Sequence, residues 1–275
     1  MSRVFIFCIS FFFLSKNLRS STSPTRVGAV SSGCGQISLL FSDPFVAWNH
    51  PGNLAFVRSG SLALSIQSNY LTRGLNRVAV SGYRNIAPKV PLGVSANFFG
   101  NAYYNESEFK LSLAKKMSEK YGAGVSIYYR RNQFPVEYFR TAHGLTFEMG
   151  AVYRFNPCWQ MGVIFLGPFG LYSSSAAKSS MDRPAGIVSI LWKVNEQLSF
   201  GAESVQTFQP SSAFKLALEY RLSEKLTIRA GLRFRQLLPA LGMSFRKGNL
   251  GVHLALEIHP YLGFSPTTAL SFQEE

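Results

Sequence analysis

The sequence predicts an all-β protein, namely a transmembrane antiparallel up-and-down β-barrel of about 14 strands. Three observations lead to this fold class. Apolar and polar residues alternate in runs of roughly ten residues. Tight polar turns alternate with other connections along the chain. The chain is also rich in aromatic residues, although it contains no apolar stretch of the length that a membrane helix needs.

The composition separates this chain from disordered proteins and from helical membrane proteins. Charged residues make up 15% of the 275 residues and aromatic residues 14%. A disordered chain is poor in aromatic residues, and a soluble domain carries ~25% charged residues. The longest uncharged apolar run, residues 4–14, is too short for a spanning helix of ~20 residues. The net charge of +14 therefore belongs to a chain that is also strongly apolar.

Residues 1–30 are expected to form an export signal peptide. Arg3 supplies a positive start, residues 4–14 an apolar core, and a stretch rich in Ser and Thr follows. No clean small-x-small site follows the apolar core, so the cleavage point is left open between Ser20 and Gly35. A buried N-terminal strand or a short core helix is the alternative.

The three cysteines do not have the spacing of a zinc or redox site. Cys8 would leave with the signal peptide. A disulfide between Cys34 and Cys158 and a pair of inert thiols are both open in an oxidising compartment.

Residues 58–275 are expected to form the barrel. Clear period-two runs cover residues 121–130, 145–155, 214–221 and 250–259. Each approaches the ~9–11 residues of a tilted membrane strand and exceeds the ~5–6 residues of a typical soluble strand. A soluble β-sandwich or solenoid is the alternative, but such folds seldom need so many long strands with one apolar face.

The turns predict the number of strands. Six short polar connections alternate with seven others, which requires 14 strands with both ends of the barrel on the short-turn side. In outer-membrane barrels the short turns face the periplasm. The short connections are residues 88–90, 118–120, 156–158, 195–197, 223–225 and 247–249.

Residues 33–56 combine a Gly-rich start, an Asp-Pro-Phe step and the sequence Asn-His-Pro-Gly-Asn-Leu-Ala. This segment resembles the N-terminal region of FadL-type outer-membrane barrels and, more closely, of the PorV/PorQ family associated with type IX secretion. Residues 259–263, His-Pro-Tyr-Leu-Gly, also resemble that family. The resemblance implies that residues 31–57 fold into the periplasmic mouth of the barrel as a plug, with a plain surface tether as the alternative. The plug motif consists of Asp43, Pro44, Trp48, Asn49, Pro51, Gly52 and Leu54.

The last strand, residues 267–272, ends in an aromatic residue at an outward position, as is common in barrels inserted into outer membranes. Leu270 and Phe272 are therefore expected to mark the strand that the outer-membrane insertion machinery engages.

The inward strand positions carry more basic than acidic residues. A lumen of one sign would concentrate anions, whereas pairing with Glu residues would instead brace the barrel interior. The aromatic residues lie on the opposite strand face, which suits lipid rather than a stacking groove, so nucleic acid is not an expected partner. The expected basic face consists of Lys110, Arg130, Arg154, Lys215, Arg221, Arg229, Arg233 and Arg235.

The sequence predicts no catalytic or metal site, no cofactor and no enzymatic activity. His253 and Glu257 are four residues apart on one strand, or about 13 Å at ~3.3 Å per residue, which is too far for one metal ion. Neither a nucleophile elbow nor a phosphate-binding loop is present in the sequence.

Two functions are compatible with a barrel in the bacterial outer membrane, where lipid is the first expected partner. The favoured function is an accessory or scaffold component of a secretion or surface-protein machinery of the type IX kind, with protein partners in that complex. The alternative is a passive FadL-like channel for small hydrophobic or anionic solutes. The longest connection, residues 169–184, is rich in Ser and Ala rather than apolar, and for this reason the accessory role is preferred.

Overall fold

The computed structural model describes residues 25–133, 141–173, 184–207, 212–234 and 236–274. Its helices are short: α2 (Ala29–Gly33), α3 (Val46–Asn49), α4 (Pro51–Leu54) and the 3-10 turn η1 (Asn69–Leu71). The strands are β1 (Ser61–Ser68), β2 (Asn76–Ala87), β3 (Val90–Gly100), β4 (Asn105–Lys116), β5 (Tyr121–Gln133), β6 (Ala142–Arg154), β7 (Trp159–Tyr172), β8 (Ala185–Lys193), β9 (Leu198–Thr207), β10 (Ser212–Arg221), β11 (Leu226–Arg233), β12 (Leu238–Lys247), β13 (Leu250–His259) and β14 (Gly263–Gln273).

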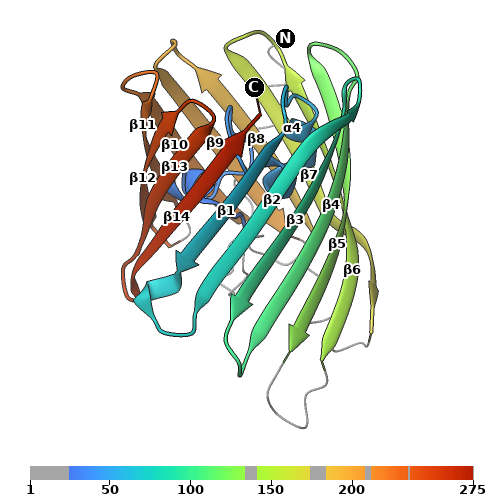
Figure 1. Cartoon of the computed structure of the whole chain (residues 1–275), viewed down its shortest axis with the longest axis vertical. Coiled ribbons are helices and arrows are strands. Elements are labelled where there is room, and N and C mark those ends of the chain that lie inside the picture. The colour runs from blue at the N-terminus through green and yellow to red at the C-terminus, as the bar shows by residue number, and fades with distance from the viewer. Residues whose placement is uncertain (1–24, 134–140, 174–183, 208–211, 235, 275) are drawn as a thin grey trace.

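The strands form a closed antiparallel barrel in which each strand pairs with its sequence neighbours (Figure 1). The barrel closes where β1 pairs with β14, in a register that joins Leu62 to Phe272 and Leu64 to Leu270. Closure pairs the backbone groups of every strand within the sheet, which a lipid environment requires. The predicted all-β barrel of 14 strands is confirmed, and the six short connections lie where the sequence predicts them.

Side chains alternate between the lumen and the outside along each strand, as the burial pattern of β4 and β14 shows. The outward positions are mostly apolar and exposed, for example Leu111, Val125, Met149, Phe165 and Leu254. In a membrane these side chains contact lipid.

Aromatic side chains mark the short-turn edge of the apolar outer surface. Trp159 and Trp192 stack there with their ring centroids 5.2 Å apart, and Phe200 stacks on Trp192. Amphipathic rings at the end of an apolar band are typical of a membrane–water interface.

The last strand is longer than the period-two run from residue 267 to 272 indicates. The structure begins β14 at Gly263 and includes Pro266, which pairs with Leu256 of β13. The pairing of β14 with β1 starts only at Thr267. Pro266 therefore lies where only one neighbouring strand is present, and a missing N–H is tolerated at such a position.

Residues 25–57 lie inside the barrel, in the half that carries the short turns, which is uppermost in Figure 1. Helix α2 contacts β11 to β14, α3 contacts β2 to β4, and α4 contacts β4 to β7. The plug segment, as we call residues 25–57, thus touches opposite walls of the lumen. Among the described residues no helix has the length and apolar character needed to cross a membrane.

The plug segment starts before the expected range of residues 31–57. Val27 and Ala29 pack with Phe45 and Trp48 in one buried apolar cluster. These residues fall within the expected signal peptide of residues 1–30, of which residues 1–24 lie outside the described part of the chain.

Candidate functional site: the plugged lumen and its outer cavity

The inner wall of the barrel carries five ion pairs among the described residues. Their N–O distances lie between 2.5 and 2.7 Å. Each inward cation in these pairs faces a carboxylate, so this part of the lumen is not a surface of one sign. The pairs are Arg130–Glu108, Lys110–Glu148, Lys215–Glu203, Arg229–Glu219 and Arg233–Glu257.

Some of these wall residues also hold the plug segment. Lys110 donates through Nζ to the backbone oxygen of Trp48 at 2.7 Å, while pairing with Glu148. Ser112, the next inward residue of β4, donates to the backbone oxygen of Ala47 at 2.7 Å. The Lys215–Glu203 pair binds the segment around Gln36 on the opposite wall. The plug segment is therefore fixed to the barrel by polar contacts as well as by packing.

Asp43 organises the plug segment from within. Its carboxylate accepts hydrogen bonds from the backbone N–H of Phe45 at 2.9 Å and from the side chain of Asn49 at 2.6 Å. Asn49 in turn bonds both the N–H and the C=O of Val27, each at 3.0 Å. Burial raises the pKa of the Asp43 carboxyl from 3.8 to about 6, although the Asn49 hydrogen bond opposes the shift.

His50 caps α4 and is fully buried. Its Nδ1 accepts a hydrogen bond from the backbone N–H of Asn53 at 3.2 Å, so the neutral ring carries its proton on Nε2. Burial, with the positive charge of Arg26 as the second cause, lowers the pKa of His50 from 6.5 to about 3. The plug segment thus contains a carboxyl whose pKa is raised and an imidazole whose pKa is lowered, in both cases mainly by burial.

A cavity of about 440 Å³ opens between the plug segment and the end of the barrel opposite the short turns. Thr25 and Gln36 of the plug segment form one side of it. Volumes of about 300–1,000 Å³ are usual for small-molecule sites. The barrel wall contributes Gln67, Asn69, Tyr70, Leu75, Arg77, Phe99, Ala213, Arg233, Gln236, Leu238, Glu257, Ile258, His259 and Ser265.

The cavity wall combines cations with aromatic and aliphatic surface. The Arg77 guanidinium lies over the Phe99 ring, 4.9 Å from its centroid, and makes no ion pair among the described residues. Arg233 pairs with Glu257 at 2.5 Å, and Glu257 also accepts a hydrogen bond from the side chain of Gln36 at 3.0 Å. A wall residue of the cavity is thereby linked directly to the plug segment.

The structure places the expected site residues in three different settings. All seven residues of the plug motif are buried in the plug segment. Of the expected basic face, Lys110, Lys215 and Arg229 are buried inside the barrel, while Arg130 and Arg233 are partly exposed. Leu270 and Phe272 point outward from β14.

Arg154 and Arg221, also members of the expected basic face, do not line the cavity. Arg154 lies over the ring of Phe56 in the plug segment, 3.7 Å from its centroid. Arg221 is exposed beside a short turn, and Arg235 lies outside the described residues. The two cysteines within the described part of the chain are unpaired, with Cys34 buried in the plug segment and Cys158 exposed in a short turn. Among the described residues no three His, Cys, Asp or Glu side chains are grouped to hold a metal ion.

Several residues of the site are absent from the sequence prediction. Gln36, Arg77 and Phe99 have no motif. Arg77 and Phe99 meet as register partners of β2 and β3, and the plug segment brings Gln36 to the same cavity. Arg26 is 2% exposed, and its Nε and Nη2 atoms find no hydrogen-bond partner among the described residues. A place on the inward face of a strand is a sequence signal for Arg77 and Phe99, since residues 77, 79 and 81 of β2 and residues 95, 97 and 99 of β3 alternate with outward neighbours.

Solved structures that resemble this barrel include two toluene transporters and a FadL homologue. The toluene transporter TbuX of Ralstonia pickettii is 13% identical, with a TM-score of 0.65 over 90% of this chain and 98% of TbuX. The toluene transporter TodX of P. putida is 9% identical, with a TM-score of 0.66 over 90% of this chain and 99% of TodX. A FadL homologue of Pseudomonas aeruginosa is 12% identical, with a TM-score of 0.60 over 89% and 96% of the two chains.

The chain has the fold of a FadL-type outer-membrane barrel. No protein-family model and no curated protein matches its sequence. The FadL-type part of the predicted resemblance is confirmed at the level of the fold, whereas the narrower resemblance to the PorV/PorQ family is not supported. The closed barrel and its apolar outer surface place the chain in a bacterial outer membrane, as the sequence predicts.

Proposed function

We propose that the protein is a passive outer-membrane channel for small solutes that combine an apolar body with an anionic group. The cavity between the plug segment and the outer end of the barrel is then the solute entrance. The observation that carries this proposal is the lining of the cavity, in which Arg77 lies over the Phe99 ring and Leu238 and Ile258 add aliphatic surface.

The two halves of such a solute have separate counterparts in the cavity. The apolar body contacts Phe99 and the aliphatic side chains, while the anionic group faces Arg77, which makes no ion pair among the described residues. Arginine stays charged in proteins and matches carboxylates and phosphates well. TbuX and TodX, which share the fold, are toluene transporters, and toluene is a small apolar molecule that corresponds to the apolar half alone.

Passage through the lumen requires the plug segment to shift. Gln36 lies at the cavity and is held by two wall residues, because Glu257 accepts from its side chain and Lys215 donates to its backbone oxygen at 2.6 Å. Arg233, the partner of Glu257, also lines the cavity. An anionic group that binds Arg233 competes with Glu257, whose carboxylate also accepts from the side chain of Gln36. The Arg233–Glu257 pair therefore connects the solute-binding wall of the cavity to the plug segment.

Reversal potentials in planar bilayers test this proposal with solutes that do not cross lipid unaided. Sodium p-toluenesulfonate supplies an aromatic anion, sodium gluconate a polar anion, and benzyltrimethylammonium chloride an aromatic cation. We expect p-toluenesulfonate to be the most permeant organic ion and Arg77→Gln to reduce its advantage. Arg84→Gln, at the short-turn end, is the matched control, since Arg84 pairs with Glu274 on the surface. Equal permeability of the three organic ions, or no conductance from a folded barrel, would contradict the proposal.

The filled lumen also fits the accessory role in a type IX-like secretion complex that the sequence resemblance suggests. The plug segment is attached to the wall on both sides, so a barrel of this kind serves equally as a membrane scaffold. Purification in mild detergent separates the two functions. Stoichiometric recovery of other secretion components with a non-conducting barrel supports the accessory role, and an isolated conducting barrel supports the channel.

A further inference from the structure

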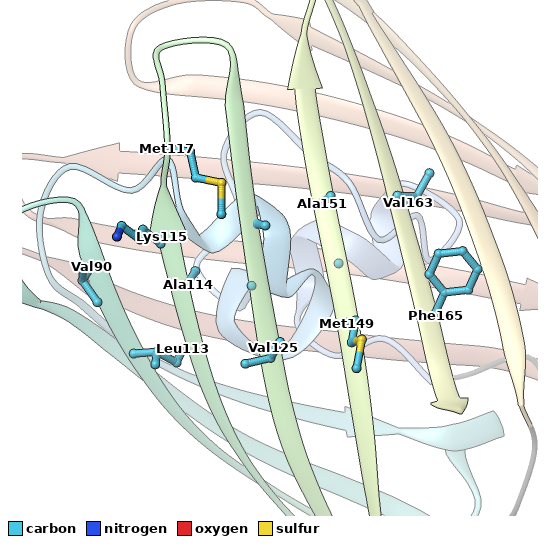
Figure 2. A pocket seen from close by; sticks show the side chains of 13 residues that line it. Val90, Leu113, Ala114, Lys115, Met117, Val125, Met149, Ala151, Val163 and Phe165 are labelled. Carbon is cyan, nitrogen blue, oxygen red and sulfur yellow. The ribbon is translucent and has the colours of Figure 1, made fainter. Parts of the chain in front are cut away.

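A groove of about 480 Å³ lies on the lipid-facing side of the barrel, in the half nearest the short turns (Figure 2). It runs across β3 to β7. It is separate from the lumen and from the outer cavity. Its lining is apolar except for Lys115 at one margin.

The groove has a hollow floor because two small outward side chains face each other. Ala123 of β5 and Ala151 of β6 are register partners. Larger outward residues bound them on the next row of the sheet, where Val125 pairs with Met149 and Met149 with Phe165. An acyl chain in this hollow would contact side chains on the floor of the groove and on both of its sides, whereas on a flat part of the outer surface it would contact only the side chains beneath it.

Basic residues gather at the short-turn margin of the groove. Lys115 is the outward residue that pairs with Ala123 in register. Lys89 precedes Val90, which lines the groove, and Lys120 lies in the turn that precedes β5. None of these three lysines forms an ion pair within the described part of the chain, whereas the neighbouring Lys116 pairs with Glu119. The margin therefore carries positive charge that the protein itself leaves unneutralised.

We infer that this groove binds one anionic phospholipid of the periplasmic leaflet. Short turns mark the periplasmic side of such barrels, so Lys115 lies near the headgroups and the hollow near the acyl chains. A lysine with an apolar stem can keep its ammonium at the interface while its methylenes lie along apolar surface. The lipid phosphate faces the three lysines and one acyl chain fills the hollow over Ala123 and Ala151. Basic side chains at a membrane surface attract anionic lipid in this manner.

Native mass spectrometry of the whole, delipidated protein in detergent tests the inference. The probes are phosphatidylglycerol and phosphatidylcholine with identical acyl chains. We expect one phosphatidylglycerol to bind the wild type at least about fivefold more tightly than phosphatidylcholine. This ratio corresponds to the attraction between one lysine and an anionic headgroup. Lys115→Gln should lose most of this preference, and Ala151→Leu, which fills the hollow, should weaken binding of both lipids.

Matched controls lie on the opposite wall. Lys247→Gln changes another lysine beside a short turn, and Ala230→Leu enlarges another outward alanine. Both should bind like the wild type. Ala123→Leu repeats the filling experiment if Ala151→Leu does not give a folded barrel, which heat-dependent migration on gels reveals.

Three results would overturn the inference. The first is a wild type that binds both lipids equally, and the second is a filled groove that retains wild-type affinity in folded protein. The third is a dimer that Ala151→Leu dissociates, because the occupant of the groove would then be a second copy of the chain.

Discussion

Lys215 and Glu203 face each other across β10 and β9 as register partners, with Nζ 2.7 Å from Oε1. Their side chains are 1% and 0% exposed. Each also binds the plug segment: Lys215 donates to the backbone oxygen of Gln36, and Glu203 accepts from the backbone N–H of Ser38 at 2.7 Å. One wall ion pair therefore fastens two residues that lie more than 160 positions earlier in the chain.

We predict that breaking this pair on one side destabilises the barrel strongly. Glu203→Gln leaves the ammonium of Lys215 buried without its counter-charge, and the loss of one partner of a buried pair costs about 3–5 kcal/mol. The double variant Glu203→Gln, Lys215→Met removes both charges and should cost less than the sum of the two single changes. Urea unfolding of the detergent-solubilised barrel measures these free energies.

The exposed pair of Lys193 and Glu196 is the control for this prediction. Its carboxylate is fully solvated on a short turn, so Glu196→Gln should leave the unfolding midpoint unchanged. Additive effects of the two changes at Glu203 and Lys215 would show that the pair does not act as a unit.

A second prediction concerns the position of the plug segment and uses the two described cysteines, Cys34 and Cys158. Cys34 is 0% exposed and burial raises the pKa of its thiol to about 12, whereas Cys158 is exposed. Only a thiolate reacts readily with maleimides. At pH 7.5 a membrane-impermeant maleimide should therefore modify Cys158 and spare Cys34 in the folded protein, and should modify both in urea.

Peptide mass mapping reads the two sites separately within one sample, so Cys158 serves as the internal control. Equal labelling of Cys34 and Cys158 before denaturation would contradict a plug segment buried in the lumen.

A third prediction concerns pH. The folded-state pKa of His50 is lowered to about 3 from 6.5, so the folded protein favours the neutral ring. This stabilisation is fully present above pH 6.5 and is lost as the pH falls toward 3, at about 1.4 kcal/mol per pH unit. His50→Gln keeps an acceptor for the Asn53 N–H and does not titrate. The stability of the wild type relative to this variant should therefore fall by about 2–3 kcal/mol between pH 6.5 and 4.5.

Asp43 titrates in the opposite sense. Its raised pKa of about 6 gives stability that is present at low pH and is lost as the pH rises through 6. The same carboxyl is present in the wild type and in His50→Gln, so its contribution cancels in the difference between the two urea-unfolding curves. Parallel pH profiles of the two proteins would show that folding does not lower the pKa of His50.

The barrel could be predicted from the sequence because its signal is local. Alternation along β5 or β13 follows from one strand having a lipid face and a lumen face, and each short turn separates two such runs. The start of β14 could not be predicted in the same way, because a proline such as Pro266 usually indicates a turn. In the structure Pro266 pairs with β13 but has no partner on β1.

The site depends on contacts that no local pattern contains. Gln36 binds Glu257, 221 positions away in the sequence, and the partner of Arg77 is the ring of Phe99 on the next strand. The alternation of polar and apolar residues identifies Lys110 and Lys215 as lumen residues, but it does not identify the carboxylate with which each one pairs. The cavity is set by how far the plug segment enters the barrel, which depends on packing against opposite walls.

A fourth prediction tests that packing directly, at the close approach of α4 to β6. A Cβ added to Gly52 would lie 2.7 Å from the Cα of Ala151 and from the carbonyl carbon of Gly150. Both are backbone atoms, which can move only if the paired strand moves with them. Gly52→Ala should therefore destabilise the protein by about 1–3 kcal/mol through overpacking. It should also make Cys34 reactive toward the maleimide, because the displaced plug segment exposes that thiol. Gly186→Ala is the matched control, since no atom lies within 4 Å of its added Cβ, and it should change stability by no more than about 0.5 kcal/mol. If Gly52→Ala instead unfolds like the wild type and still protects Cys34, then α4 does not rest on the β6 backbone, and the attachment of the plug segment depends on its polar contacts alone.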